Sequence, residues 1–165
     1  MAKVLVVIDM QTGTTQSRYH GKYLNRKWWK RHSTVVSNIL KLATRVDKVI
    51  FVIITSFRNK RFLMPIDELA SLALGSQIVF KFDDDGSDEI APYLSLDDNV
   101  ILCGMNTDAC IIRTSSGLQK KDFKVSIVGD ACWTVYSSQS PRSHNNAISR
   151  MGNTYKMPIL KTETV

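Results

Sequence analysis

The stretch that decides the fold is "NVILCGMNTDACIIRTSSGLQKKDFKVSIVGD", residues 99–130. It opens with a short apolar run at 99–104 and closes with a second one at 124–130. The residues between them, 107–121, have the length and apolar spacing of a helix. Two apolar runs joined by a helix predict a strand–helix–strand unit with parallel strands.

The same alternation continues along the rest of the chain. Further strands are predicted at 3–9, 48–54, 77–81 and, as a last edge strand, 158–161. Further helices are predicted at 33–46 with Ser33 as N-cap, at 65–74 with Pro65 in the first turn, and at 87–94 and 141–151. Strands that are apolar throughout are buried on both faces, which is typical of a parallel sheet covered by helices. With right-handed crossovers, we expect a three-layer α/β/α sandwich with a mainly parallel sheet of about six strands, forming one α/β domain over residues 1–165.

Composition is that of a globular protein, with 44% hydrophobic and 22% charged residues among 165. No apolar run approaches the roughly 20 residues that a membrane span needs, so no membrane partner is expected. The opening "MAKVLVVIDMQ" turns acidic too early for a signal peptide, and the expected location is cytoplasmic. The three cysteines show neither disulfide-framework nor zinc spacing, which predicts free thiols.

The net charge of +7 is concentrated in "RYHGKYLNRKWWKR", residues 18–31, where basic and aromatic residues alternate. Such a mixture can bind nucleic acid through phosphate attraction and base stacking. It can equally be a solvated loop and helix start with aromatic anchors. We favour the second interpretation and keep nucleic acid as an alternative partner.

Polar residues stand where four of the predicted strands end: Asp9, Lys81, Cys110 just beyond its strand, and Asp130. Ligands of parallel sheets bind beyond these carboxyl ends. A thiol becomes nucleophilic as a thiolate, which a helix N-terminus and a nearby ammonium both favour. A carboxylate can accept the thiol proton and later deliver it to a leaving group. The set therefore suits acyl transfer.

Each of these residues also has a plain structural interpretation. A cysteine near a helix start can be a small buried hydrophobe. An aspartate after a first strand can cap a turn or bind a metal, and a lysine at a strand end can be solvated. The residues alone leave both interpretations open.

Three blocks resemble a known family. They are "VLVVIDMQ" at 4–11, "QIVFKFDDDGSDEIAPYL" at 77–94 and, the longest and most specific, "VILCGMNTDACIIRTSSGLQKKDFKVSIVGDACW" at 100–133. In this order they are similar to the isochorismatase-like cysteine hydrolases, which include nicotinamidases, N-carbamoylsarcosine amidohydrolases and ureidoacrylate hydrolases. The resemblance runs from Lys3 to about His144.

The resemblance implies a nucleophile at Cys110, a general base at Asp9 and a supporting cation at Lys81. It also implies a cis peptide bond between Met105 and Asn106, and an oxyanion hole formed by the backbone N–H groups of Asn106 and Cys110. The implied fold is the sandwich described above, assembled as a homo-oligomer, either a dimer or a tetramer.

The chain departs from the family in its metal ligands. Nicotinamidases carry an Asp-x-His and further histidines after the second strand, whereas "TSFRNKRF" at 55–62 has neither Asp nor His. We therefore expect no catalytic metal and no cofactor. The acidic run "DDDGSD" at 83–88 lacks the length and closing Glu of a calcium loop, and we interpret it as a polar turn and helix N-cap.

The substrate cannot be carried over from the resemblance. Family members that act on the vinyl ether of isochorismate often lack the cysteine, so Cys110 favours an amide-like bond in a small molecule. Gln11, Trp28 and Arg58 are candidate residues of the substrate pocket. We expect a metal-independent cysteine hydrolase that works through a thioester. The alternative is a fold without turnover that acts as a binding module through residues 18–31.

Overall fold

The sheet has six strands. The structure, a computed structural model, describes residues 1–12, 26–55, 64–134 and 140–165, without the side chains of 26–30, 140 and 141. The strands are β1 (Lys3–Ile8), β2 (Lys48–Ile54), β3 (Gln77–Lys81), β4 (Asn99–Met105), β5 (Lys124–Trp133) and β6 (Ile159–Leu160). They lie in the order β3-β2-β1-β4-β5-β6, and every neighbouring pair is parallel.

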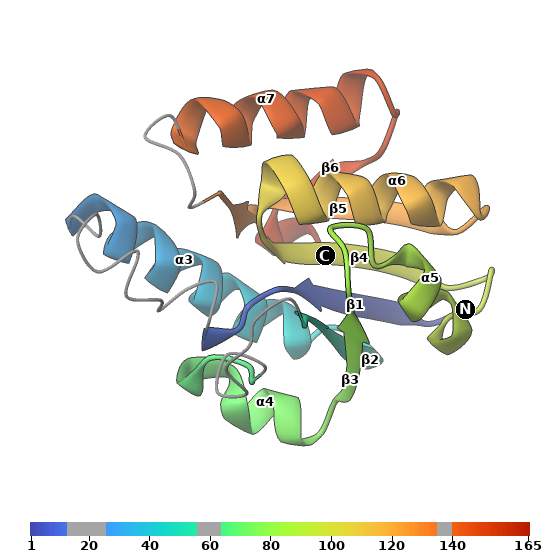
Figure 1. Cartoon of the computed structure of the whole chain (residues 1–165), viewed down its shortest axis with the longest axis horizontal. Coiled ribbons are helices and arrows are strands. Elements are labelled where there is room, and N and C mark those ends of the chain that lie inside the picture. Colours follow the sequence, from blue (N-terminus) through green and yellow to red (C-terminus); the bar gives the residue numbers. More distant parts are fainter. Residues whose placement is uncertain (13–25, 56–63, 135–139) are drawn as a thin grey trace.

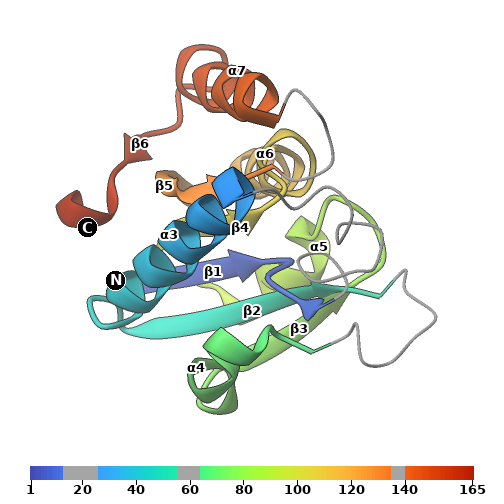
Figure 2. The same ribbon diagram turned by 90° about the vertical axis from the view of Figure 1, so that its left-hand side faces the viewer.

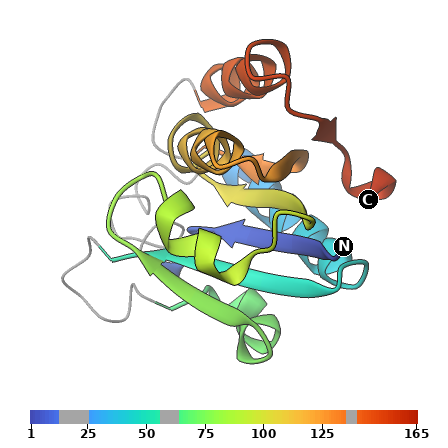
Figure 3. The ribbon, with the colours of Figure 1, turned by 90° about the vertical axis from the view of Figure 1, so that its right-hand side faces the viewer.

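Helices cover both faces of this sheet. They are α3 (Arg26–Ala43), α4 (Ala70–Leu74), α5 (Ser87–Ile90), α6 (Ile112–Lys120) and α7 (Ser140–Asn153). Short turns of other helix types are η2 (Asp67–Leu69), η3 (Ala91–Tyr93), η4 (Thr107–Ile111) and η5 (Thr162–Thr164). Helix α3 packs on β1, β4 and β5 in front of the sheet in Figure 2, whereas α5 and α6 lie in front of the opposite face in Figure 3. The predicted three-layer sandwich is confirmed (Figure 1).

The strands form because their side chains are apolar on both faces. Residues 4–8 of β1 are fully buried. Helix α3 contributes Val35, Ile39 and Leu42 to the same core. Among the described helices, none is long and apolar enough to cross a membrane.

Helix α3 begins at Arg26, so the prediction of a start at Ser33 was wrong. No proline or glycine separates Arg26 from Ser33, and lysine and arginine are good helix formers. The helix therefore includes residues 26–31 of the basic segment that we had interpreted as a loop and helix start. Ser33 is exposed on the helix surface rather than at its N-cap.

Two other boundaries differ from the prediction. Pro65 forms an antiparallel bridge with Gln11, and the helical turn begins later, at Asp67. Strand β5 continues to Trp133, so Asp130 lies inside the strand and not at its end. The Asp130 Oδ1 atom accepts hydrogen bonds from the backbone N and the Oγ1 of Thr162, both at 2.9 Å, and holds the C-terminal turn.

Candidate active site

The carboxyl edge of the sheet brings Asp9, Lys81 and Cys110 together. The Nζ atom of Lys81 lies 3.1 Å from Oδ2 of Asp9, and the Cys110 thiol is near enough to Asp9 for the two groups to shift each other's pKa. All three residues are buried. Strand order reverses between β1, which ends beside Asp9, and β4, which leads to Cys110. The cluster therefore occupies the switch point where parallel sheets bind ligands.

Close packing of β1 against β4 fixes the position of Asp9. A Cβ atom on Gly104 would lie 2.2 Å from the backbone O of Ile8, so only glycine allows these strands to approach. Gly104 has a φ of +112°, which also favours glycine. Asp9 itself has a φ of +52°, a left-handed conformation that aspartate tolerates better than most residues, and its N–H donates to the O of Val52 at 2.9 Å.

Lys81 reaches Asp9 from β3, with β2 between the two strands. Its stem passes close to Gly86, where a Cβ atom would lie 2.9 Å from Cδ of Lys81. The ammonium donates a second hydrogen bond, at 3.0 Å, to the backbone O of Asp84. A fully buried lysine needs such partners, because an unpaired buried charge is strongly unfavourable.

Cys110 belongs to η4, a π-helical turn between β4 and α6. The backbone O of Asn106 accepts hydrogen bonds from the N–H groups of Ala109 at 3.1 Å and Ile111 at 3.0 Å. The peptide bond between Met105 and Asn106 is cis, and this is the bond that the family resemblance indicated. The turn therefore carries both of the expected oxyanion donors, the N–H groups of Asn106 and Cys110.

A second carboxylate, which the sequence had not suggested, contacts the thiol. The Oδ1 atom of Asp84 lies 3.5 Å from Sγ of Cys110, and its Oδ2 lies 2.7 Å from Nη1 of Arg113. We had interpreted residues 83–88 as a polar turn and helix cap, and the neighbouring Asp85 does cap the N–H of Ser87 at 2.8 Å. The one available signal was that Asp84 follows Lys81 by three residues.

The charges of the cluster explain its protonation. Burial raises the pKa of the Asp9 carboxyl, although Lys81 and the hydrogen bond from Cys110 act in the opposite direction. Burial also raises the pKa of the Cys110 thiol, and Asp9 raises it further, while Lys81 lowers it. Both shifts favour the protonated form of the group, so they make the thiol a weaker acid and Asp9 a stronger base.

A second polar contact, between η4 and α7, also holds the turn that carries Cys110. Oγ1 of Thr107 lies 2.9 Å from Nδ1 of His144, and both residues are buried. The His144 ring packs against Trp133 with the ring centroids 5.1 Å apart. The guanidinium carbon of Arg31 lies 4.8 Å from the centroid of the Trp133 ring. Burial, followed by the charge of Arg31, lowers the pKa of His144 to about 4. No spacing along the chain indicated that this histidine supports the turn before Cys110.

The three candidate pocket residues have different outcomes. Gln11 is fully buried, and its side-chain amide exchanges hydrogen bonds with the backbone N and O of Ile54 at 2.8 and 3.0 Å. Gln11 therefore joins the segment after β1 to the end of β2. Arg58 and the side chain of Trp28 lie outside the described residues. Across the described ranges, no group of three His, Cys, Asp or Glu residues could hold a metal ion, and the segment 56–63 lies outside them.

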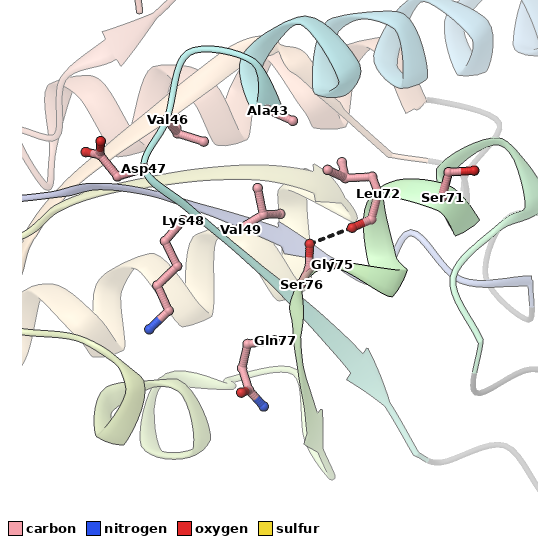
Figure 4. Close-up of a pocket in the computed structure, with 10 residues that line it drawn as sticks. All are labelled: Ala43, Val46, Asp47, Lys48, Val49, Ser71, Leu72, Gly75, Ser76 and Gln77. Carbon is pink, nitrogen blue, oxygen red and sulfur yellow. Dashed lines mark hydrogen bonds between the residues drawn. The ribbon is translucent and has the colours of Figure 1, made fainter.

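A separate pocket of about 510 Å³ lies at the other end of the sheet (Figure 4). It is lined by residues at the starts of β2 and β3, among them Lys48 and Gln77, and by the helix α4. Oγ of Ser76 donates to the O of Leu72 across its wall at 2.7 Å. Since Asp9, Lys81 and Cys110 lie at the carboxyl edge of the sheet, this pocket is distinct from the Cys110 site.

Comparison with known proteins assigns the family. Residues 3–163 match the isochorismatase domain, which is nearly the whole chain. The chain belongs to the isochorismatase domain family. A curated relative, isochorismatase domain-containing protein 2 of Xenopus laevis, is 42% identical over 53 residues. That match covers 32% of this chain and 24% of the frog protein, so the two share a local segment.

Solved structures of isochorismatase-like hydrolases have the same fold. An isochorismatase-like hydrolase from Alkaliphilus metalliredigens superposes with a TM-score of 0.78 at 16% identity, covering 99% of this chain and 96% of the other. The N-carbamoylsarcosine amidase of Thermoplasma acidophilum gives 0.74 at 17% identity, covering 100% and 99%. At these identities the likeness establishes the fold alone. Any inference about the reaction must rest on the residues of this site.

Proposed function

We propose that this chain is a metal-independent cysteine hydrolase that cleaves an amide-like C–N bond in a small molecule. The observation that supports this most strongly is the buried ion pair between Lys81 and Asp9 beside the Cys110 thiol. A buried lysine and aspartate contribute little to stability compared with apolar residues of the same volume. Their place beside a thiol at the switch point of the sheet agrees with a catalytic role.

In the first half of the reaction, Asp9 accepts the proton of Cys110 as the sulfur attacks the substrate carbonyl. The N–H groups of Asn106 and Cys110 stabilise the oxyanion of the tetrahedral intermediate. The ammonium of Lys81 keeps Asp9 ionised before attack and close to the sulfur throughout. The C–N bond then breaks, Asp9 gives its proton to the leaving nitrogen, and an amine and a thioester on Cys110 are formed.

In the second half, water attacks the thioester. Asp9 accepts a proton from the water, the C–S bond breaks, and the sulfur leaves as thiolate. The proton on Asp9 returns to the sulfur, so the products are a carboxylic acid and the original thiol. The protein therefore returns to its starting state without any oxidant or reductant. The absence of Asp and His from residues 55–62 is why no metal is included.

A panel of primary amides, N-carbamoyl compounds and ureido acids tests this proposal. We expect ammonia or amine release by the wild-type protein and a mass increase on the peptide containing Cys110 when turnover is quenched. Cys110→Ala should abolish both signals. Cys103→Ala, which removes a buried thiol from β4, is the matched control and should retain them. Turnover that survives Cys110→Ala would contradict the proposal.

The alternative, a binding module, depends on residues 18–31. Most of this segment lies outside the described residues, but the guanidinium of Arg31 is already stacked on Trp133. A gel shift with mixed DNA and RNA separates the two functions. Salt-sensitive binding that survives Cys110→Ala but is lost when Lys27, Lys30 and Arg31 are neutralised would favour the module. The expected homo-oligomer stays a prediction, for which light scattering is the direct measurement.

A further inference from the structure

The Cys110 thiol contacts two carboxylates that differ in exposure. The Asp9 side chain is 1% exposed, and the Asp84 side chain, which comes from the turn after β3, is 34% exposed. Oδ1 of Asp84 lies 3.5 Å from Sγ of Cys110. Asp84 is therefore the more solvent-exposed of the two carboxylates near the thiol.

Several contacts fix the orientation of Asp84. Its backbone O accepts hydrogen bonds from Nζ of Lys81 at 3.0 Å and from Oγ1 of Thr114 at 3.3 Å. The same Thr114 hydroxyl accepts the N–H of Gly86 at 3.0 Å. Oδ2 of Asp84 pairs with Nη1 of Arg113 at 2.7 Å. The backbone and one oxygen are thus held by the protein, and the other oxygen is directed at the thiol.

Asp84 is unfavourable for making the nucleophile. Its negative charge opposes thiolate formation at Cys110, so it cannot serve to activate the sulfur. The favourable role left to it involves the substrate. The thiol has a single proton, and once it has passed to Asp9 the sulfur offers no donor to Oδ1 of Asp84. An N–H group of the bound substrate can replace that donor, whereas a carboxylate at the same place would meet like charge.

We propose that Asp84 determines specificity, selecting substrates that carry an N–H donor, best a protonated amine, beside the scissile carbonyl and rejecting those that carry a carboxylate there. This inference rests on the proposed function, because it takes Cys110 to be the attacking atom. Arg113 supports the selection by occupying Oδ2, which leaves a single oxygen for the ligand. It also keeps its own charge engaged and away from anionic substrates.

Two alkylating reagents of nearly equal size test the inference without a known substrate. Iodoacetamide carries an N–H donor next to its reactive carbon, and iodoacetate carries a carboxylate there. The rate of modification of Cys110 by each is measured by peptide mass spectrometry, and their ratio is compared between variants. The variants are Asp84→Asn, Asp84→Glu and, as a control for net charge, Asp88→Asn, whose side chain is 86% exposed and pairs with Lys121.

We expect the wild-type protein to prefer iodoacetamide, and the preference to fall about tenfold in Asp84→Asn, as for a charge effect of about one pKa unit. Asp84→Glu, which keeps the charge, and Asp88→Asn should retain the preference. An unchanged ratio in Asp84→Asn would overturn this inference alone. If Cys110 of the wild type is modified no faster than the other cysteines, the proposed function is overturned and this inference with it.

Discussion

Asp9 and Asp84 contact the same thiol but are built in opposite ways. Asp9 follows a central strand, is buried, and pairs with the buried Lys81 at 3.1 Å. Asp84 lies in a turn, is partly exposed, and pairs with Arg113, whose side chain is 60% exposed. A buried carboxylate with a raised pKa suits proton transfer, whereas a carboxylate at the solvent side suits recognition. In the proposed mechanism, environment and not residue type thus gives each carboxylate its role.

The largest difference between Asp9 and Asp84 should appear in the turnover of their variants. Asp9→Asn removes the general base, and we expect a loss in kcat of about 10²–10⁴-fold. Asp84→Asn removes no proton-transfer group, and we expect kcat to change by less than about tenfold, with the larger effect on KM. Steady-state kinetics on the best amide of the panel provides the comparison. A greater loss of kcat in Asp84→Asn than in Asp9→Asn would show that the roles are reversed.

Removing the cationic partner of each carboxylate should change protein stability by different amounts. Lys81→Met leaves the buried Asp9 without its ammonium, and we expect a loss of about 3–5 kcal/mol in the free energy of unfolding. Arg113→Met breaks an exposed pair, and we expect a loss of about 0–1 kcal/mol. Urea denaturation measures both. The double variant Lys81→Met/Asp9→Asn should recover part of the loss, and failure to do so would contradict the assignment of the loss to an unpaired charge.

The packing that positions Asp9 can be disturbed without touching Asp84. In Gly104→Ala the new methyl group would meet the O of Ile8 at 2.2 Å in a backbone with φ of +112°, so we expect a loss of stability of about 3 kcal/mol. Gly75→Ala is the control, because nothing lies within 4 Å of the added Cβ. Thermal and urea unfolding of the two variants should differ accordingly. Equal stabilities would mean that β1 and β4 are not in tight contact.

The contribution of His144 to the free energy of unfolding should depend on pH. His144 has a pKa of about 4 in the folded protein and about 6.5 when unfolded, so the unfolded state binds more protons between these values. Stability should therefore fall as pH is lowered from 6.5 to 4, by about 2 kcal/mol from this group. His144→Gln should flatten this part of the pH profile of unfolding free energy. An identical profile in Thr107→Val and wild type would indicate that the Thr107 contact contributes nothing.

The sequence was sufficient for the sheet because the strands are apolar on both faces and the chain alternates regularly. It was insufficient for the start of α3, since basic and aromatic residues are compatible with both a loop and a helix. The end of β5 was also misplaced, because a charged residue such as Asp130 is typical of a strand end. In the structure Asp130 lies inside β5, and Thr162 donates a hydrogen bond to its carboxylate.

For the site, strand ends and family resemblance together pointed to Asp9, Lys81 and Cys110. Neither could find Asp84 or His144. Asp84 reaches the thiol because the backbone of its turn is held by Lys81 and Thr114, and His144 reaches Thr107 because α7 packs on η4. Such contacts depend on the paths of separate segments in space, which no spacing along the chain encodes.

In the proposed mechanism, Asp9 assists Cys110 as a base. Burial raises the pKa of all three cysteines, so ionisation alone does not distinguish them, whereas Cys110 is the cysteine that lies beside the Asp9–Lys81 pair. The direct measurement is the rate of iodoacetamide modification at Cys103, Cys110 and Cys132, in wild type and in Asp9→Asn. We predict that Cys110 reacts much faster than the other two in wild type. Asp9→Asn should remove this advantage, because losing the base outweighs the lower thiol pKa that loss of the Asp9 charge brings. Equal rates in wild type, or an advantage that persists without the Asp9 carboxylate, would contradict the account.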